Sequence, residues 1–476
     1  MVGADRMVVH RRNDRLRLSA QTFVRHAGDE SVVWCPRTGG CTVMRDARAI
    51  LDEVALEWRG RGEIMQSVAE RFGCAAAEVA EGVDAVLGEL AAQGFVETDA
   101  DGRCAAGDTD AAGRAGGTVR GNAPTANPAD SEADADGGDE SPLVGFCRRH
   151  GLPIELHIDL TDACNERCVH CYLPKGGVHF LDPALAFKVL DEFRAVQGLT
   201  VTLSGGECLL HRDFAAILRH ARELGLNVIV LSNLTLCDAE TVELLKEVDP
   251  QFVNVSLYAV DEAVHDSITQ IPGSCAKSKA AIDALAAAGV HVRIQTPFMY
   301  GNRGCVAELK AYAAERRIHL VADCDIFGGT DQTCANRRHA LSPEEMEALV
   351  SANRDAFPRS PLPPEACGRG AKVCGIGDDK LNLDAEGRYY PCDGFHGAIL
   401  GDARTDSLSD VWTGDALNRL RALKNADFGP CASCADRAWC KVCPMRNFNE
   451  TGDMLVPAPW RCEATRLFRR IFGEVN

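Results

Sequence analysis

Between residues 152 and 335 the sequence alternates short apolar runs rich in β-branched residues with longer stretches of helical periodicity. Repeated β–α units predict an α/β fold with a parallel sheet covered by helices, because parallel strands need a crossover connection between them. Six runs favour a partial (β/α)6 barrel of the TIM type over residues 150–340, with its chemistry at the carboxyl ends of the strands. The expected strands are IELHIDL (154–160), LTVTLSGGE (199–207), NVIVLSN (227–233), FVNVSLY (252–258), VHVRIQT (290–296) and IHLVADCD (318–325).

Three cysteines closely follow the first expected strand, in the segment DACNERCVHCYLPKGG (162–177). The chain has 22 cysteines but no apolar export signal at its start, so we expect a reducing environment in which clustered thiols are metal ligands rather than disulfides. Cys164, Cys168 and Cys171 can bind three irons of a [4Fe–4S] cube and leave the fourth iron open for a substrate or cofactor. A zinc site is the alternative, and it would need a fourth nearby ligand.

This Cys-x3-Cys-x2-Cys spacing resembles the signature of the radical S-adenosylmethionine (radical SAM) enzymes. The resemblance implies that SAM chelates the open iron and is cleaved to a 5′-deoxyadenosyl radical, which takes a hydrogen atom from the substrate. It also implies a set of SAM contacts, namely His170 beside the adenine, Gly205, Gly206 and Glu207 of LSGGEC at the methionine amino group, and the strand-end residues Asn233, Ser256 and Gln295 at the methionine or ribose. For the last three, a polar residue that simply ends a strand is the alternative. Cys208 stands where the family usually has proline, and the sequence gives it no role.

The C-terminal region, residues 360–476, carries eight more cysteines at ligand-like spacing. Their series resembles the cysteine-rich SPASM extension of radical SAM enzymes, which holds two auxiliary [4Fe–4S] clusters, so three clusters are expected in all. The family usually places three residues in the last local pair, whereas two lie between Cys440 and Cys443 here. The resemblance assigns Cys367, Cys374, Cys392 and Cys443 to the first auxiliary cluster, and Cys431, Cys434, Cys440 and Cys462 to the second. Two zinc ribbons are the alternative.

Residues 15–98 predict a compact unit with a hairpin at 31–44 and three helices after it, within 46–60, 62–73 and 75–97. This winged-helix arrangement resembles the PqqD-like peptide-recognition element of ribosomal-peptide modification systems. The resemblance implies that a leader peptide binds as an added strand at a sheet edge. A purely structural winged helix is the alternative. The small, polar and acidic residues of 99–141 predict a flexible linker.

The net charge of −18 argues against a nucleic-acid partner, because binding to phosphates relies on a basic surface. The last helix of the N-terminal unit is acidic where a DNA reader would be basic. No run of 18 or more apolar residues suggests a membrane span, and charges interrupt every apolar stretch near the N-terminus. We therefore expect a cytoplasmic protein without a membrane or nucleic-acid partner.

Together these features predict a radical SAM oxidoreductase that matures a ribosomally synthesised precursor peptide. The resemblance implies a thioether or carbon–carbon cross-link, auxiliary clusters that take up the surplus electron, and an external donor such as flavodoxin or ferredoxin. Asp393, directly after Cys392, matches the base of the sulfatase-maturing branch and would deprotonate the attacking group, with a structural role as the alternative. Two other functions stay open: maturation of a folded enzyme or subunit, and redox sensing by an iron–sulfur regulator.

Overall fold

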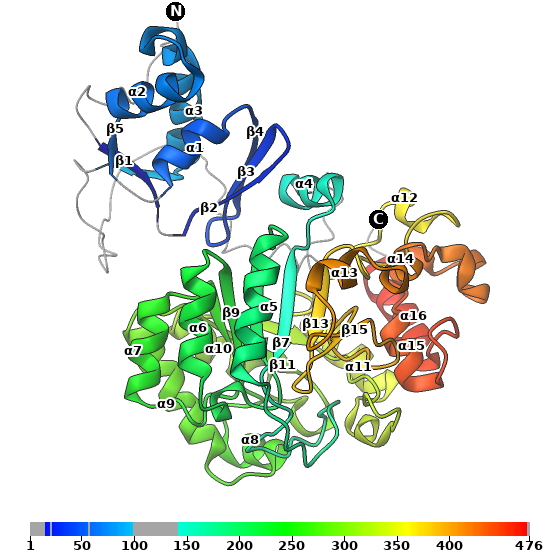
Figure 1. The fold of residues 1–476 in the computed structure, drawn as a ribbon. Coiled ribbons are helices and arrows are strands. Elements are labelled where there is room, and N and C mark those ends of the chain that lie inside the picture. Colours follow the sequence, from blue (N-terminus) through cyan, green and yellow to red (C-terminus); the bar gives the residue numbers. More distant parts are fainter. Residues whose placement is uncertain (1–14, 20, 56–57, 99–140, 474–476) are drawn as a thin grey trace, which may run out of the picture. The chain divides into compact units, whose positions relative to one another are not determined.

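The computed structural model describes residues 15–19, 21–55, 58–98 and 141–473. They form two compact units, coloured along the chain in Figure 1. The first holds the described residues up to Thr98 together with a helix at 142–150, and the second begins at Gly151. The predicted linker, 99–141, lies outside the described residues except for Ser141.

The N-terminal unit packs two small sheets and three helices around one apolar core. The predicted hairpin is confirmed as β3 and β4, and the three predicted helices are present. The first helix ends at Val54 rather than near residue 60, because the chain turns there into a short strand. The sheets have the orders β2-β3-β4 and β5-β1-β6. The elements are β1 (Arg15–Leu18), β2 (Phe23–Ala27), β3 (Glu30–Cys35), β4 (Gly40–Arg45), α1 (Arg48–Val54), β5 (Arg59–Gly60), α2 (Arg61–Phe72), α3 (Ala76–Ala92) and β6 (Val96–Thr98).

One helix of this unit, α4 (Pro142–His150), has no counterpart among the predicted elements. It contacts β3 and β4 and therefore belongs with the N-terminal unit, although the chain enters the second unit directly after it. Gly151 adopts the left-handed conformation, with φ +64°, that commonly follows the end of a helix.

The second unit is built on a nine-stranded sheet of order β12-β11-β10-β9-β8-β7-β13-β14-β15. All six predicted barrel strands are present and parallel, each within one or two residues of its expected start. The sheet is not closed, because β7 pairs with β13 on the side away from β8. Their bounds are β7 (Glu155–Asp159), β8 (Thr200–Ser204), β9 (Asn227–Ser232), β10 (Phe252–Ser256), β11 (Val292–Pro297) and β12 (His319–Asp323), with the intervening helices α5 (Pro183–Ala195), α6 (Phe214–Glu223), α7 (Ala239–Val248), α8 (Glu262–Thr269), α9 (Ser274–Ala287) and α10 (Val306–Glu315).

The C-terminal region adds three strands and several short helices to the same unit. β13 runs parallel to β7, while β14 and β15 return antiparallel. The elements are α11 (Pro343–Ala352), α12 (Pro364–Cys367), β13 (Lys380–Leu383), β14 (Arg388–Tyr390), β15 (Gly401–Asp402), α13 (Leu408–Thr413), α14 (Asp415–Arg421), α15 (Pro444–Thr451) and α16 (Pro459–Gly473).

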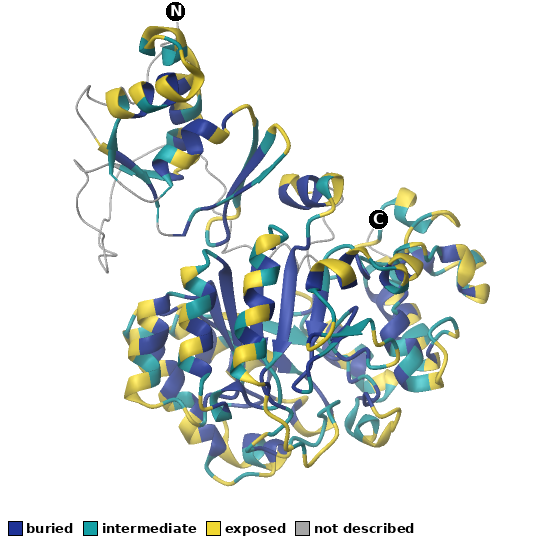
Figure 2. Ribbon diagram, in the orientation of Figure 1, coloured by how far each residue is buried: buried dark blue, intermediate teal, exposed yellow. Residues whose placement is uncertain are grey.

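Side-chain alternation divides β7 into an apolar and a polar face. Leu156 and Ile158 of β7 are fully buried in the core that the flanking helices complete (Figure 2). Glu155, His157 and Asp159 alternate with them and point to the other face, since successive strand residues face opposite sides. β7 thus directs polar groups inward toward the concave side of the sheet.

A buried charge cluster joins the segment after β12 to the last two helices. The carboxylate of Asp325 is 7% exposed and forms ion pairs with Arg446 of α15 and Arg461 of α16. A buried carboxylate needs such cationic partners to offset its lost hydration. The pairs therefore hold the two C-terminal helices against the barrel.

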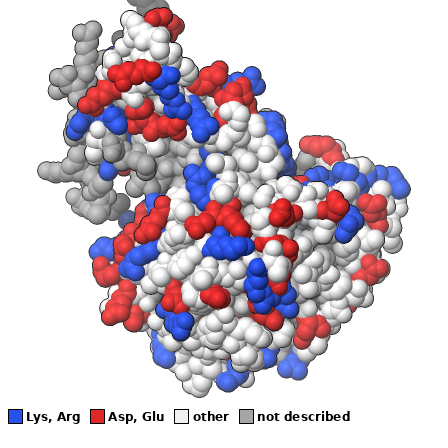
Figure 3. Space-filling model, in the orientation of Figure 1, with Lys and Arg blue, Asp and Glu red and all other residues white. Residues whose placement is uncertain are grey.

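On the face drawn in Figure 3, acidic and basic side chains are interspersed. Within the described ranges, no helix is long and apolar enough to cross a bilayer.

Candidate cofactor and active site

The loop with the three cysteines leaves the end of β7 and returns at the start of α5. Its ends are fastened together, because the Thr161 hydroxyl donates to the His179 carbonyl at 2.6 Å. The Asp162 carboxylate also accepts from the His179 backbone N–H and lies next to its ring Nδ1, both at 2.7 Å. The loop is thus a closed excursion at the carboxyl edge of the sheet, as predicted.

The three thiols of this loop lie in surroundings that disfavour a bare thiolate. Burial raises the pKa of Cys164 to about 12, and it also raises the pKa values of Cys168 and Cys171. The S–H of Cys168 donates to the Glu166 carboxylate at 3.2 Å, and burial raises the pKa of Glu166 to about 7. Because thiolates are the form that binds iron, this site needs the positive charge of bound metal to release its protons. Three neighbouring thiols without a strong protein counter-charge fit a metal cluster.

The two glycines after β8 pack against the backbone that leads into the cysteine loop. A Cβ on Gly205 would lie 2.2 Å from the Thr161 carbonyl oxygen, and one on Gly206 would lie 2.2 Å from the Ala163 carbonyl oxygen. Without side chains, the Gly206 N–H donates to Thr161 O at 2.7 Å and the Glu207 N–H to Ala163 O at 2.9 Å. Gly205 also has φ +129°, which favours glycine. The glycine pair is therefore required for contact between two loops, and its contact with SAM stays a prediction.

Glu207 serves as an internal acceptor and is only 1% exposed. Its Oε1 accepts from the Ser232 hydroxyl at 2.7 Å and the Leu209 N–H at 3.0 Å, while Oε2 accepts from the Asn233 N–H at 2.8 Å. The Asn233 side chain donates in turn to Asn165 of the cysteine loop at 2.9 Å. Both predicted SAM contacts thus brace the loop against β8 and β9, and an ammonium contact through Glu207 stays a prediction.

His170 lies against Tyr258, with ring centroids 4.8 Å apart in an edge-to-face arrangement. Burial lowers the pKa of His170 to about 4, and its buried Nδ1 has no hydrogen-bond partner among the described residues. That nitrogen is a vacant polar position beside the cysteine loop. Ser256 and Gln295 lie opposite each other on β10 and β11, and Gln295 is exposed and hydrogen-bonded to Asn254. All three remain predictions as cofactor contacts.

The C-terminal cysteines gather in two groups. Cys374 and Cys443 lie near enough to Cys392 for their charges to add to the burial that raises its pKa. Cys440, Cys462 and Cys434 do the same for Cys431, whose pKa burial raises to about 11. Cys367 is not among the cysteines that influence Cys392 or Cys431, and its thiol donates to the Pro363 carbonyl oxygen at 3.5 Å.

The interleaved ligand sets expected from the sequence, Cys367 included, stay a prediction. Within the part of the chain that is described, no three His, Cys, Asp or Glu side chains converge on a single-ion site.

Asp393 lies beside the barrel interior, next to other charged side chains. Its carboxylate is 3.5 Å from the Lys380 ammonium, which together with His157 holds the pKa of Asp393 well below its ordinary value. Burial alone would lower the pKa of His157, but the nearby carboxylates of Asp159, Asp393 and Glu155 raise it. In this arrangement Asp393 is an ionised and paired carboxylate, hence a weak proton acceptor.

Sequence reasoning missed several polar residues around Asp393. His157 Nε2 lies 3.2 Å from Asp159 Oδ1, and the Asn382 amide donates to Asp159 Oδ2 at 3.3 Å. Tyr172, directly after the third cysteine, lies close to Gly394, whose ideal Cβ would be 3.5 Å from the ring. The inward alternation of Glu155, His157 and Asp159 along one strand was the available signal. The partners on β13 had none, because they depend on long-range pairing.

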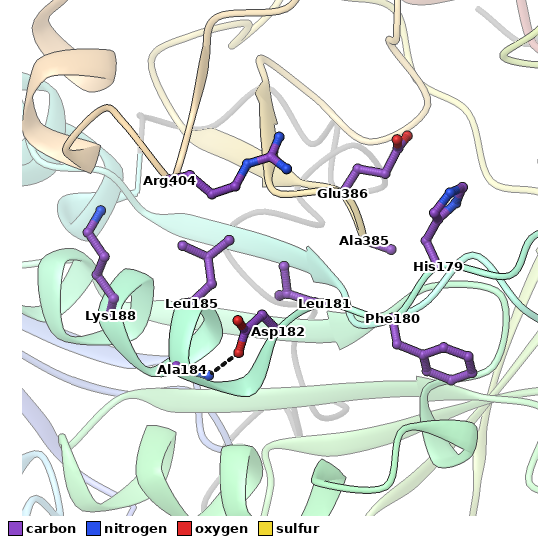
Figure 4. A pocket seen from close by; sticks show the side chains of 10 residues that line it. All are labelled: His179, Phe180, Leu181, Asp182, Ala184, Leu185, Lys188, Ala385, Glu386 and Arg404. Atoms are coloured by element: carbon purple, nitrogen blue, oxygen red, sulfur yellow. Dashed lines mark hydrogen bonds between the residues drawn. The ribbon is translucent and has the colours of Figure 1, made fainter.

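A pocket of about 580 Å3 lies outside this set of residues (Figure 4). It is enclosed by the segment that ends the cysteine loop, by the first turns of α5 and by the loops after β13 and β15. Asp182 caps α5 there by accepting from the Ala184 N–H at 2.9 Å. The pocket shares no residue with the predicted ligands or SAM contacts. Its lining residues are His179, Phe180, Leu181, Asp182, Ala184, Leu185, Lys188, Ala385, Glu386 and Arg404.

Two parts of the chain match known sequence families. Residues 158–308 match the radical SAM superfamily, and residues 374–435 match SPASM, an iron–sulfur cluster-binding domain. The chain carries a radical SAM domain and a SPASM domain. Neither matched range includes the N-terminal unit, so its role in peptide recognition stays a prediction.

Two curated relatives each match 63% of this chain. The AdoMet-dependent heme synthase of Methanosarcina barkeri is 25% identical over 336 residues, which span 63% of this chain and 94% of the synthase. AlbA, the antilisterial bacteriocin subtilosin biosynthesis protein of Bacillus subtilis, is 25% identical over 316 residues, spanning 63% of this chain and 68% of AlbA.

A solved structure extends the likeness to nearly the whole chain. SuiB of Streptococcus suis, crystallised with S-adenosylmethionine, superposes with a TM-score of 0.60 at 15% identity, covering 94% of this chain and 99% of SuiB. At this identity the likeness shows the fold, and the predicted fold class is confirmed.

A radical SAM chain with a SPASM domain is an enzyme, and the two domains imply SAM and iron–sulfur clusters as its cofactors. The residues present fit these groups, since three thiols share one loop and the C-terminal thiols gather in two groups. When bound, the SAM–cluster pair supplies a 5′-deoxyadenosyl radical that removes a hydrogen atom from a substrate. The barrel supplies the polar concave face on which that substrate would lie.

Proposed function

We propose that this enzyme matures a ribosomally synthesised precursor peptide by closing a thioether or carbon–carbon cross-link in it. The observation that carries the proposal is the combination of a radical SAM barrel with an N-terminal unit that has an unpaired strand edge. SuiB, which shares this fold over 94% of the chain, has been crystallised with its precursor peptide SuiA. AlbA takes part in the biosynthesis of a bacteriocin, subtilosin.

The leader of the precursor would bind at the edge of β4. Among the described strands, β4 pairs only with β3, so its outer backbone groups are available for one more strand. A peptide that adds there gains affinity from backbone hydrogen bonds and specificity from alternate side chains. Helix α3, with Val83 and Leu87 turned to the core, presents its acidic side to solvent, and this charge would favour basic leader residues.

The core of the peptide would lie on the concave face of the barrel. Closing a cross-link removes one hydrogen atom, one proton and one electron from the peptide. Asp393 would take the proton once substrate binding weakens its pairing with Lys380, because an unpaired carboxylate has a higher pKa. Asp159, held by His157 and Asn382, borders the same space.

The surplus electron would pass to auxiliary clusters held by the C-terminal cysteines. We propose three [4Fe–4S] clusters, one at Cys164, Cys168 and Cys171 and two in the SPASM domain. The auxiliary ligand sets are Cys367, Cys374, Cys392 and Cys443, and Cys431, Cys434, Cys440 and Cys462. A flavodoxin or ferredoxin would supply the electron that starts each turnover.

The test is an anaerobic assay of the reconstituted full-length enzyme with SAM, a reductant and short peptides encoded beside its gene. We expect 5′-deoxyadenosine together with a peptide that has lost two hydrogen atoms by mass spectrometry. Cys168→Ala is the inactive control. SAM cleavage without modification of any such peptide, or specific binding of DNA by the same preparation, would contradict the proposal.

A further inference from the structure

The β2–β3–β4 sheet of the N-terminal unit is buried on both of its faces. Val33 and Cys35 of β3 pack in the core that α1, α2 and α3 complete. Val32 and Trp34 alternate with them and point to the opposite, outer face. They are 0% and 2% exposed, so the outer face is covered as well.

Helix α4 lies on this outer face and contacts both β3 and β4 (Figure 1). Near its start, the Leu143 backbone forms a hydrogen bond with the thiol of Cys41, which pairs across the strands with Trp34. In the middle, Phe146 and Cys147 are completely buried. The helix therefore presents an apolar side to the sheet along its length.

The last turn of α4 is fixed by charge. Glu30, at the start of β3, lies 2.9 Å from His150 and 3.1 Å from Arg149, and Arg45 of β4 is also within 3.4 Å of it. His150 and Arg149 lower the pKa of Glu30 to about 2. Three basic side chains thus meet one carboxylate that stays ionised, which sets the register of the helix on the sheet.

The residue after α4 is held by the other unit. The Trp412 indole N–H donates to the Gly151 carbonyl at 2.7 Å, and the Ile154 N–H donates to the Asp379 carbonyl at 2.9 Å. His150 and Gly151 are therefore fixed to different units although they are neighbours in sequence. While α4 is bound to the sheet, a single peptide link joins the two units.

We propose that the outer face of the β2–β3–β4 sheet is a helix-docking surface, that α4 is its occupant, and that this docking shortens the covalent connection between the two units to one peptide link. If α4 leaves the sheet, the connection grows to the 52 residues of 99–150.

The docked state has a consequence for catalysis that rests on the proposed function. A leader held by a closely joined unit presents its core peptide at a higher effective concentration than one held by a long tether. Release of α4 should therefore raise the KM for the precursor while the rate of SAM cleavage without peptide stays the same.

Two thiols report directly on the docking. Cys41 lies on the sheet side of the contact and Cys147 on the helix side, so both should react slowly with N-ethylmaleimide in the full-length enzyme. Glu30→Lys, which repels the basic end of α4, and Phe146→Asp, which removes its apolar anchor, should each speed labelling of both thiols at least tenfold. Cys74 at the end of α2 is the internal reference, and peptide mapping separates the sites.

Glu97→Lys is the matched control, because Glu97 pairs with Arg17 in the same unit and lies on β6 of the other small sheet. Its labelling pattern should equal that of the unmodified enzyme. The proposal is overturned if Cys147 of the unmodified enzyme reacts as fast as the exposed Cys334, or if neither α4 variant accelerates labelling. An unchanged KM in variants with faster labelling would overturn the effect of the short connection, whereas absence of any peptide turnover would count against the proposed function alone.

Discussion

Gly206→Ala isolates the contact between the Gly-Gly segment and the cysteine loop. Gly206 has no left-handed backbone conformation, so alanine at this position adds only a methyl group. That methyl carbon would lie 2.2 Å from the Ala163 carbonyl oxygen and 2.6 Å from its carbon, both of them backbone atoms that cannot rotate away. The two loops must therefore separate.

Separation removes two hydrogen bonds, from the Gly206 N–H to Thr161 O and from the Glu207 N–H to Ala163 O. At about 0.5–1.5 kcal/mol each, their loss costs about 1–3 kcal/mol of unfolding free energy. For a unit of this size that corresponds to a fall in Tm of roughly 1.5–4.5 °C. Because Ala163 precedes Cys164, we also expect weaker SAM binding and less iron retained at the first cluster.

The assay is calorimetry of the purified enzyme with iron and sulfide analysis and equilibrium SAM binding. Gly304→Ala is the matched control, because no atom lies within 4 Å of the added carbon. It should leave all three measurements within error of the parent enzyme. Equal Tm and equal SAM affinity for the two variants would refute the role assigned to the glycine contact.

The other predictions concern ligands and buried charge. Cys168→Ala should lose SAM cleavage and the iron of one cluster, whereas Cys208→Ala, which removes a buried thiol from the core, should keep both in 5′-deoxyadenosine and iron assays. Cys434→Ala should lose about four irons per chain by metal analysis but still cleave SAM, because the SAM site lies in the barrel. Asp325→Asn leaves two half-buried arginines without their carboxylate and should cost about 2–3 kcal/mol in denaturant unfolding, whereas the exposed Asp355→Asn should cost less than about 0.5 kcal/mol.

The barrel was predictable because its signals are local. Each strand is a short apolar run, and each is followed by a helix of the expected period, so β7 to β12 lie close to their predicted bounds. The cysteine loop and the glycines were found by spacing. The same local signals gave the hairpin of the N-terminal unit.

The features that the sequence did not predict depend on contacts between residues that are far apart in the chain. The pair Lys380–Asp393 exists because β14 returns antiparallel beside β13, with Tyr390 opposite Asn382, and no local pattern contains that register. Helix α4 is only nine residues long, so its apolar side gave a weak periodic signal. Ser141 and Pro142 at its start, with Gly151 at its end, were the available boundary signals.

The burial of Cys208 indicates a structural role that the sequence spacing could not assign. The sequence placed this thiol next to Glu207, at a position that the family usually fills with proline. In the fold it is completely buried, and its S–H donates to the Leu231 carbonyl at 3.2 Å. It therefore behaves as a small core residue that links the segment after β8 to β9.

The two matched sequence families are separate ranges of the chain, but both contribute strands to one sheet. β13 lies inside the SPASM match, yet it forms a parallel pair with β7, the strand that leads into the cysteine loop. In that register Lys380 is opposite Glu155 and Asn382 is opposite His157, so the SPASM domain completes the polar face that borders the site. Removing the SPASM domain would leave β7 as an open edge and take away Asn382, one of the two partners of Asp159. The barrel and the SPASM domain must therefore fold as one unit, and a chain cut between them should lose stability as well as the auxiliary cysteines.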